Sequence, residues 1–260
     1  MTCKICNSYS NCAFTIQVLK KYDTKYFRCN NCGYLFVEDP FWLDEAYQDS
    51  INISDTGLID RNISFSKMLA VLIYFNFNKY DKFLDYAGGY GIFTRLMRDI
   101  GFDFYWNDKY TQNLLAKGFE ADANGNFKYE LVTAFEVFEH LADPKEEITR
   151  MLQHSDTIVF STELLPNNTP EPGKWWYYGF EHGQHISFYS KTTFTWLADY
   201  FDLKYYYING IHFLTSKKIN YSAMAIEKKL SNYGLFSFVK KMMKSKTLSD
   251  SLMLKSSKTQ

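Results

Sequence analysis

Apolar and polar residues along this chain fall into segments that have the lengths and periods of strands and helices. The strand-like segments read FLDYA, FDFYWND, YELVTAF, DTIVFST, LKYYYIN and IHFLT. Helix-length segments lie near 92–100, 110–117 and 143–154, and a strongly apolar helix is expected from about Asn62 to Tyr74. Strands that alternate with helices indicate a parallel, doubly wound sheet. Because Asn209-Gly210 between the last two strands predicts a tight turn, we expect an α/β, Rossmann-like sheet with a late antiparallel hairpin.

Composition divides the chain into four expected parts. Residues 1–40 form a cysteine-containing module, 41–80 a linker and helix, 81–216 the α/β domain, and 217–260 a Lys-rich helical tail. The tail after Ser216 contains ten Lys, one Glu and one Asp, so its net charge is +8. Because the net charge of the whole chain is zero, residues 1–216 carry a net charge of −8. A chain without a basic field has no general attraction for nucleic acid. No export signal or long apolar run is visible, which favours a cytoplasmic location.

The cysteines predict a metal site. Cys3 and Cys6 form one C-x-x-C pair, and Cys29 and Cys32 form another after 22 intervening residues. Two thiolates of such a knuckle point at one centre, and a glycine after the last cysteine, here residue 33, permits a tight turn. Four thiolates suit a closed tetrahedral zinc site, whereas a disulfide is disfavoured in a cytosolic protein. We therefore predict a zinc ribbon with a structural Zn²⁺, and Cys12 as an idle thiol or spare ligand.

A glycine-rich turn follows the first strand of the α/β domain, in the stretch KFLDYAGGYGIFTRLMRDIG. Gly88, Gly89 and Gly91 permit a ligand to approach the backbone closely. The third glycine of a dinucleotide-binding motif is replaced by Thr94. Asp85 ends the strand, and a carboxylate there repels a pyrophosphate but attracts a sulfonium. These residues predict a site for S-adenosylmethionine; the alternative is a connecting turn without a ligand.

An acidic residue at the end of the second strand supports the same ligand. Asp108 lies 17 residues after Gly91 in the sequence. A carboxylate in this position can accept hydrogen bonds from both ribose hydroxyls of an adenosine ligand.

Two further motifs identify a family that this chain resembles. EVFEHLADP stands at 136–144 and GQHISFYS at 183–190. With the glycine turn and Asp108, they resemble class I S-adenosylmethionine-dependent methyltransferases over about residues 45–215. The bacterial branch encoded among polysaccharide-synthesis genes pairs these two motifs, and the double C-x-x-C module is similar to that of sugar methyltransferases acting on nucleotide-linked deoxysugars. Ala87 departs from the glycine that is usual at that position.

The resemblance implies a cofactor role for several residues. Residues 87–91 would line the methionine part of S-adenosylmethionine, and Asp108 would hold the ribose. Asp122-Ala123 would lie near the adenine, and Phe135 and Glu136 near the reacting sulfur. The implied cofactor-binding set is Asp85, Ala87, Gly88, Gly89, Gly91, Asp108, Asp122, Phe135 and Glu136.

Methyl transfer to a hydroxyl requires alignment of the acceptor and a base for its proton. His140 follows the fourth strand, and His185 lies in the GQHISFYS motif. Both are expected at the carboxyl edge of the sheet, where ligands of open α/β folds bind. We predict His185 as the catalytic base and His140 as the second candidate. The alternative for His140 is a helix-start residue that bonds to the backbone.

Residues 161–190 form a long, proline-containing segment that we interpret as a functional loop over the acceptor. Flat aromatic faces beside hydroxyl groups suit a sugar or nucleoside, although a hydrophobic plug for the sheet end is the alternative. The predicted substrate-binding residues are Trp175, Trp176, Tyr177, Tyr178 and His182.

The expected function is O-methylation of a sugar, or of a small phosphorus-containing decoration, on a capsular or surface polysaccharide precursor. The substrate would be a small or nucleotide-linked glycan. An RNA-modifying methyltransferase with a zinc ribbon is an alternative, disfavoured by the acidic catalytic part. A non-catalytic zinc-ribbon interaction protein is another. The Lys-rich tail has the composition of a weak contact for an anionic membrane surface or of a solvated tail.

Overall fold

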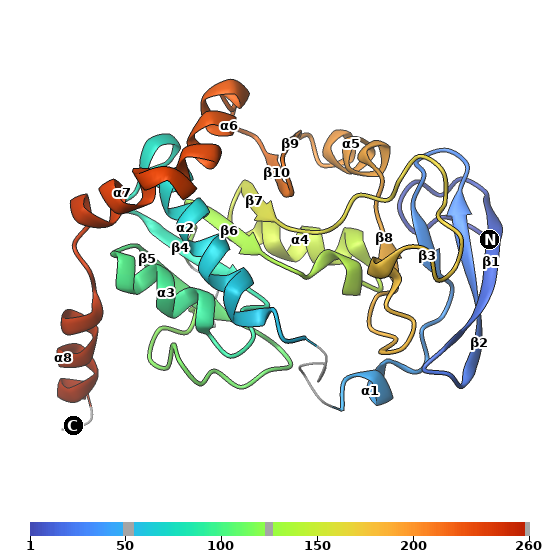
Figure 1. Ribbon diagram of the computed structural model, residues 1–260, viewed down its shortest axis with the longest axis horizontal. Coiled ribbons are helices and arrows are strands. Elements are labelled where there is room, and N and C mark those ends of the chain that lie inside the picture. The colour runs from blue at the N-terminus through green and yellow to red at the C-terminus, as the bar shows by residue number, and fades with distance from the viewer. Residues whose placement is uncertain (49–54, 123–126, 258–260) are drawn as a thin grey trace. The chain divides into compact units, whose positions relative to one another are not determined.

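The computed structural model of this protein describes residues 1–48, 55–122 and 127–257 (Figure 1). By its contacts the chain forms two compact units, which are described separately. The first unit comprises Met1–Ser54, Phe135–Arg150 and Phe160–Ser216. The second comprises Asp55–Ala134, Met151–Val159 and Lys217–Gln260. The division into four domains expected from composition stays a prediction.

The strand order confirms the predicted α/β, Rossmann-like fold. A six-stranded sheet has the order β5-β4-β6-β7-β10-β9. β4 pairs in parallel with both β5 and β6, whereas β9 and β10 form the antiparallel hairpin. Both residues of the Asn209-Gly210 turn have positive φ, as a two-residue hairpin turn requires. The strands are β4 (Lys82–Tyr86), β5 (Asp103–Asn107), β6 (Leu131–Ala134), β7 (Thr157–Phe160), β9 (Lys204–Ile208) and β10 (Ile211–Thr215).

In the second unit the helices pack around one apolar helix, α2 (Leu58–Asn76), which was predicted over Asn62 to Tyr74. Its residues 68–73 are all buried, so its centre packs on every side. α3 (Ile92–Ile100), α6 (Tyr221–Leu230) and α7 (Phe236–Met242) contact α2.

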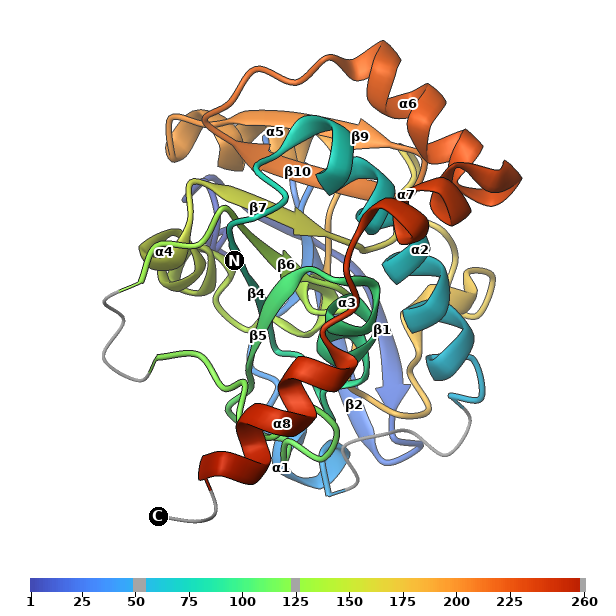
Figure 2. The ribbon, with the colours of Figure 1, turned by 90° about the vertical axis from the view of Figure 1, so that its left-hand side faces the viewer.

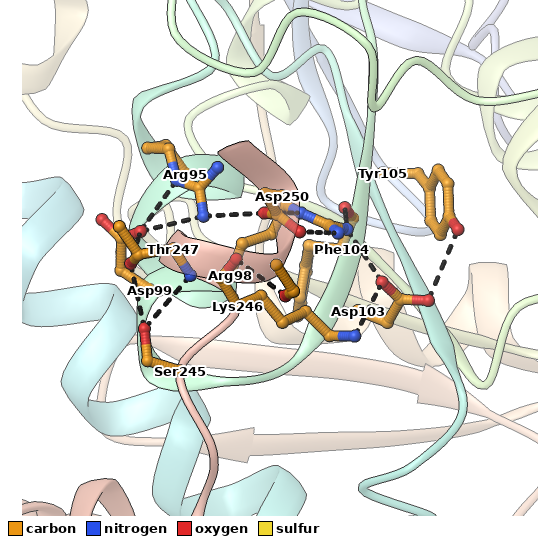
Figure 3. Close-up of polar contacts among 11 residues, drawn as sticks. Arg95, Arg98, Asp99, Asp103, Phe104, Tyr105, Ser245, Lys246, Thr247 and Asp250 are labelled. Carbon is orange, nitrogen blue, oxygen red and sulfur yellow. Dashed lines mark hydrogen bonds and ion pairs between the residues drawn. The ribbon is translucent and has the colours of Figure 1, made fainter. Parts of the chain in front are cut away.

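The last helix, α8 (Thr247–Ser257; Figure 2), is joined to α3 by a buried ion pair (Figure 3). Arg98 donates through Nε and a terminal nitrogen to the two carboxylate oxygens of Asp250, at 2.8 and 2.9 Å. Both side chains are nearly inaccessible, at 4% and 6% exposure. A bidentate pair with such geometry offsets the cost of burying two charges. The tail is therefore a packed element at this point. Among the described helices, none is long and apolar enough to cross a bilayer.

In the first unit a four-stranded sheet joins the cysteine module to the GQHISFYS motif. Its order is β1-β2-β3-β8, and β3 pairs antiparallel with β8 through Leu35–Phe188 and Phe36–Ser187. The two-residue strand β8 was not predicted, because its pairing partner is distant in sequence. The strands are β1 (Ser10–Val18), β2 (Tyr22–Cys29), β3 (Leu35–Val37) and β8 (Ser187–Phe188). The remaining elements are α1 (Leu43–Ala46), η1 (Phe138–His140), α4 (Pro144–His154), η2 (Trp176–Tyr178) and α5 (Lys191–Tyr200).

The helix predicted near 110–117 is wrong, because these residues form turns and bends. Leu114 and Leu115 both direct their N–H groups to the Tyr90 carbonyl. The N–H of Ala116 donates to the side chain of Asn113, at 2.9 Å. Backbone donors used in this way cannot build a helical ladder.

Candidate functional site

The glycine turn after β4 has the backbone geometry that its sequence predicts. Gly89 and Gly91 have φ of 54° and 84°, in the left-handed region that favours glycine. A Cβ on Gly88 would lie 2.7 Å from the Asp85 carboxylate and 2.9 Å from the Trp106 ring, so only glycine fits there. Ala87 also has positive φ, at 54°, which costs about 1 kcal/mol for a residue with a side chain.

Two residues of β5 and its following turn hold Gly89 in place. The Gly89 N–H donates to Asp108 Oδ2 at 2.9 Å, and its carbonyl accepts from Trp106 Nε1 at 2.8 Å. Asp108 Oδ1 accepts from the N–H groups of Tyr110 and Thr111, both at 2.7 Å. Asp108 thus lies at the glycine turn, and its ribose contact stays a prediction. The part played by Trp106 was missed, because only the strand register places it beside Gly89.

Asp85 is buried beneath this turn and is only 3% exposed. It accepts from the hydroxyl of Thr94 at 2.9 Å and lies 3.0 Å from that of Thr133. Burial raises the pKa of Asp85 to about 7. The Thr133 hydroxyl is also 3.2 Å from the Leu84 carbonyl, but it has one proton. A protonated Asp85 can donate to Thr133 while Thr133 donates to Leu84, which satisfies every group.

We expect Asp85→Asn to raise the free energy of unfolding at pH 8. The folded pKa of Asp85 lies above its usual 3.8, so ionisation destabilises the folded chain as pH rises from about 4 to about 7. Asparagine keeps the shape, donates to Thr133 and never ionises, so the gain should be of the order of a few kcal/mol at pH 8 and vanish near pH 4. Urea unfolding of both proteins at pH 5 and pH 8 measures it. An equal gain at both values would contradict this account of ionisation.

The other predicted cofactor residues lie at strand ends. Trp106 and Glu120 form an isolated parallel β-bridge in the second unit, and Asp122 follows two residues after Glu120. Ala123 lies outside the described residues. Phe135 and Glu136 belong to the first unit. Glu136 has a positive φ of 55°; its N–H donates to Ser161 Oγ, and that hydroxyl donates back to its carboxylate.

Three of the five histidines gather in the first unit. The ring of His185 lies 5.0 Å from that of His140 and 4.8 Å from that of His182, between centroids. His185 Nδ1 is 2.6 Å from the Tyr177 carbonyl, and His140 Nδ1 is 3.1 Å from the Gln184 carbonyl. Since a carbonyl only accepts, Nδ1 of His185 carries the proton and its Nε2 keeps a lone pair, whereas Nδ1 of His140 lies 2.8 Å from the Tyr47 hydroxyl as well, which can donate or accept. The structure therefore brings the two predicted catalytic histidines together.

The surroundings keep these imidazoles neutral. Burial, and then the neighbouring His140, lower the pKa of His185 to about 2. Burial also lowers the pKa of His140. Burial and the carboxylate of Glu139, which the Tyr177 hydroxyl contacts, raise the pKa of Tyr177 well above its usual value. Glu139 is 1% exposed and was missed, because the sequence places it among apolar residues.

The aromatic residues predicted to bind substrate occupy different environments. Tyr177 and Tyr178 are 3% and 1% exposed and lie in an aromatic core with residues of β1, β2, β3 and β8. Trp175 packs against this core, whereas Trp176 is 77% exposed. His182 accepts from the Gln184 N–H at 3.2 Å. Tyr177 and Tyr178 thus pack into the core of this unit, and substrate binding by the five residues stays a prediction.

The four cysteines of the two C-x-x-C pairs converge as predicted. Their Sγ atoms all lie within 4.8 Å of one another. Cys3 and Cys32 are 3.7 Å apart and Cys6 and Cys29 are 3.3 Å apart between Sγ atoms, and no disulfide joins them. Zn–S bonds of about 2.3 Å give a tetrahedral edge of about 3.8 Å, so the cluster fits Zn²⁺. Cys12 is exposed and outside the cluster.

The turn at the second cysteine knuckle also fits the prediction. Gly33 has a φ of 72°, and a Cβ there would lie 2.8 Å from Ser190 Oγ. The N–H groups of Asn31 and Cys32 point to Cys29 Sγ at 3.4 and 3.5 Å, the arrangement that stabilises a thiolate.

The sequence matches a known domain family and resembles several solved structures. A family model described as a methyltransferase domain matches residues 61–208. CalO1, a methyltransferase of calicheamicin biosynthesis solved with bound S-adenosylhomocysteine, is 10% identical with a TM-score of 0.45, over 69% of this chain and 60% of that one. TnmH is 12% identical with a TM-score of 0.46, over 68% and 60%.

A third similar structure is magnesium protoporphyrin IX methyltransferase from Synechocystis PCC 6803. It is 14% identical with a TM-score of 0.41, over 66% of this chain and 90% of that one. This chain thus spans about three fifths of the length of CalO1 and of TnmH. No curated protein matches the sequence significantly.

Proposed function

Because this chain belongs to the methyltransferase-domain family, we propose that it methylates an oxygen atom on a capsular or surface polysaccharide precursor, with S-adenosylmethionine as donor. The acceptor oxygen would belong to a sugar or to a small phosphorus-containing decoration. The observation that carries the proposal is the glycine turn. Its Gly89 is held by two hydrogen bonds, yet apart from its chain neighbours Gly88 and Tyr90 no described residue has an atom within 4 Å of where its Cβ would be, so a ligand has room at the backbone.

The residues of the second unit divide the task of holding the donor. The backbone of residues 87–91 would bind the methionine part, and Asp108 would orient the ribose. Asp85 would place a carboxylate near the positive sulfur, and a nearby cation favours its ionised form. When bound, the donor supplies a methyl carbon made electrophilic by the sulfonium, and transfer leaves the neutral thioether.

The histidine cluster of the first unit would handle the acceptor. As the new C–O bond forms, the hydroxyl proton has to leave the acceptor oxygen. The imidazole of His185 would accept this proton, with His140 as the second candidate. An aligned base or an equivalent group contributes about 10²–10⁴-fold to such a rate.

A polar groove beside the second cysteine knuckle, lined by none of the predicted catalytic or substrate-binding residues, has the chemistry of a glycan-binding surface. Its volume is 450 Å³, and its lining offers amide, hydroxyl and guanidinium groups but few apolar side chains. Polyhydroxylated ligands need such dense hydrogen-bonding partners. The lining includes Asn11, Arg28, Asn30, Asn31, Asn167 and Thr169.

The cysteine cluster would hold a structural Zn²⁺ through Cys3, Cys6, Cys29 and Cys32. Four thiolates close the coordination sphere, so this metal would stabilise the fold and take no part in chemistry. We place the reaction in the cytoplasm, where nucleotide-linked precursors are made.

Calorimetric titration with S-adenosylmethionine tests the proposal. We expect saturable binding of one molecule per chain, weakened at least about tenfold in Asp108→Ala, which loses one hydrogen bond to Gly89 and one to the ribose. Asp156→Asn removes an exposed carboxylate elsewhere and should bind as the wild type does. Absence of saturable binding would favour a non-catalytic scaffold instead. A mass-spectrometric screen of nucleotide sugars for a 14-dalton gain, roughly one methylene, then identifies the acceptor class.

A further inference from the structure

A second metal-binding constellation lies outside the cysteine cluster. Glu139, His140 and His185 each offer one ligand atom, and these three atoms lie within 4.8 Å of one another. Glu139 and His140 belong to η1, and His185 lies two residues before β8. Because η1 contacts β8, residues about 45 positions apart in the sequence meet here.

The orientation of the imidazoles matches that of metal ligands. Histidines that bind metals almost always donate the other ring N–H to a carboxylate or a backbone carbonyl. His185 does so toward the Tyr177 carbonyl at 2.6 Å, which leaves its Nε2 as a ligand atom. Nδ1 of His140 lies 3.1 Å from the Gln184 carbonyl and 2.8 Å from the Tyr47 hydroxyl, and its Nε2 is the ligand atom when Nδ1 donates to Gln184.

The third member supplies the negative charge. Glu139 is 1% exposed, and a buried carboxylate is stable only when it is paired or hydrogen-bonded. The Tyr177 hydroxyl contacts it, and this hydroxyl also lies 3.0 Å from Thr162 Oγ1. Tyr177 therefore supports both Glu139, through its side chain, and His185, through its carbonyl. Such outer contacts orient metal ligands in known sites.

We propose that Glu139, His140 and His185 bind one first-row divalent transition-metal cation. Two imidazoles and one carboxylate suit Mn²⁺, Fe²⁺ or Co²⁺ better than Mg²⁺ or Ca²⁺, which prefer oxygen ligands throughout. Three protein ligands leave positions open for an acceptor, in contrast to the closed cysteine cluster.

This inference rests on the proposed function and deepens it. A cation held at this point would lower the pKa of an acceptor hydroxyl bound to it, so that the oxygen attacks the methyl carbon as an alkoxide while the C–O bond forms and the S–CH₃ bond breaks. The acceptor proton then passes to water, and the lone pair of His185 serves as a ligand in place of a proton acceptor. The requirement for a divalent cation would extend to any hydroxyl or phosphate oxygen that the enzyme methylates.

Electron paramagnetic resonance with Mn²⁺ tests the site directly, since bound Mn²⁺ loses the six-line signal of the free ion. The full chain is used with zinc retained in the cysteine cluster, which elemental analysis confirms in each sample. We expect one Mn²⁺ per chain for the wild type and an affinity at least about 100-fold lower for Glu139→Gln and for His185→Ala. His154→Ala changes a histidine outside the cluster and should bind Mn²⁺ as the wild type does.

Equal Mn²⁺ binding in the wild type and in both cluster variants would overturn the site, as would a wild type that binds none. Circular dichroism shows whether each variant folds, and His140→Ala replaces any variant that does not. Calorimetry with S-adenosylmethionine on the same samples separates the two proposals. If the chain binds S-adenosylmethionine but not Mn²⁺, only the proposed metal site is refuted. If it binds Mn²⁺ but not S-adenosylmethionine, the proposed methyl transfer is refuted.

Discussion

Replacement of His185 by alanine should lower the rate of methyl transfer by about 10²–10⁴-fold and leave S-adenosylmethionine binding unchanged. The imidazole is held by the Tyr177 carbonyl and lies beside His140, in the unit that does not contain the glycine turn. Under the proposed function this imidazole would either accept the proton of the acceptor or bind a cation, and alanine can do neither. Single-turnover rates with saturating cofactor measure the loss, and calorimetry measures cofactor binding.

His154→Ala provides the matched control for His185. His154 is the last residue of α4 and contacts the ring of Tyr129; it belongs to the second unit and is not a member of the cluster. Its replacement should leave the turnover close to that of the wild type. A His185→Ala protein with unchanged turnover would remove His185 from the mechanism, and rescue of the lost rate by added imidazole would favour the proton-acceptor role over that of a metal ligand.

Removal of zinc from the cysteine cluster should unfold much of the first unit and abolish methyl transfer. Structural zinc contributes on the order of 10 kcal/mol to the folding of small modules. The Cys32 carbonyl accepts hydrogen bonds from the hydroxyls of Ser190 and Thr193 at the start of α5. The hydroxyls of Tyr34 and Ser187 also meet at 2.6 Å, so β8 and the adjacent His185 depend on the same module.

Cys32→Ser and Cys12→Ser form a matched pair for this test. Cys32 is buried in the cluster, whereas Cys12 is exposed, with its thiol near the Phe14 carbonyl. We expect Cys32→Ser to lose zinc, near-ultraviolet circular dichroism of the packed aromatic rings, and turnover. Cys12→Ser should keep all three. Retention of aromatic signals and turnover after full zinc removal would show that the sheet of β1, β2, β3 and β8 holds without the metal.

The predictions that held depended on local patterns. Alternating apolar segments located the six strands of the α/β sheet, and the Asn-Gly dipeptide located the hairpin. The spacing of Cys3, Cys6, Cys29 and Cys32 predicted their convergence, since each knuckle is a turn of four residues. The glycine turn was readable because positive φ at Gly89 and Gly91 is a local requirement. The helix predicted at 110–117 does not form, because backbone N–H groups of this segment donate to the carbonyl of Tyr90 in another segment, which the local pattern does not reveal.

The sequence by itself determined the α/β fold, the cysteine cluster and the glycine turn with Asp85 and Asp108, because these features depend on neighbouring residues and on their period. Tertiary structure alone decided that Asp85 is buried under the turn with Thr94 and Thr133, and that Trp106 holds Gly89. It also decided that Glu139 joins the two histidines. These contacts join side chains that lie far apart in the sequence, and long-range pairing of this kind leaves no periodic trace in the chain.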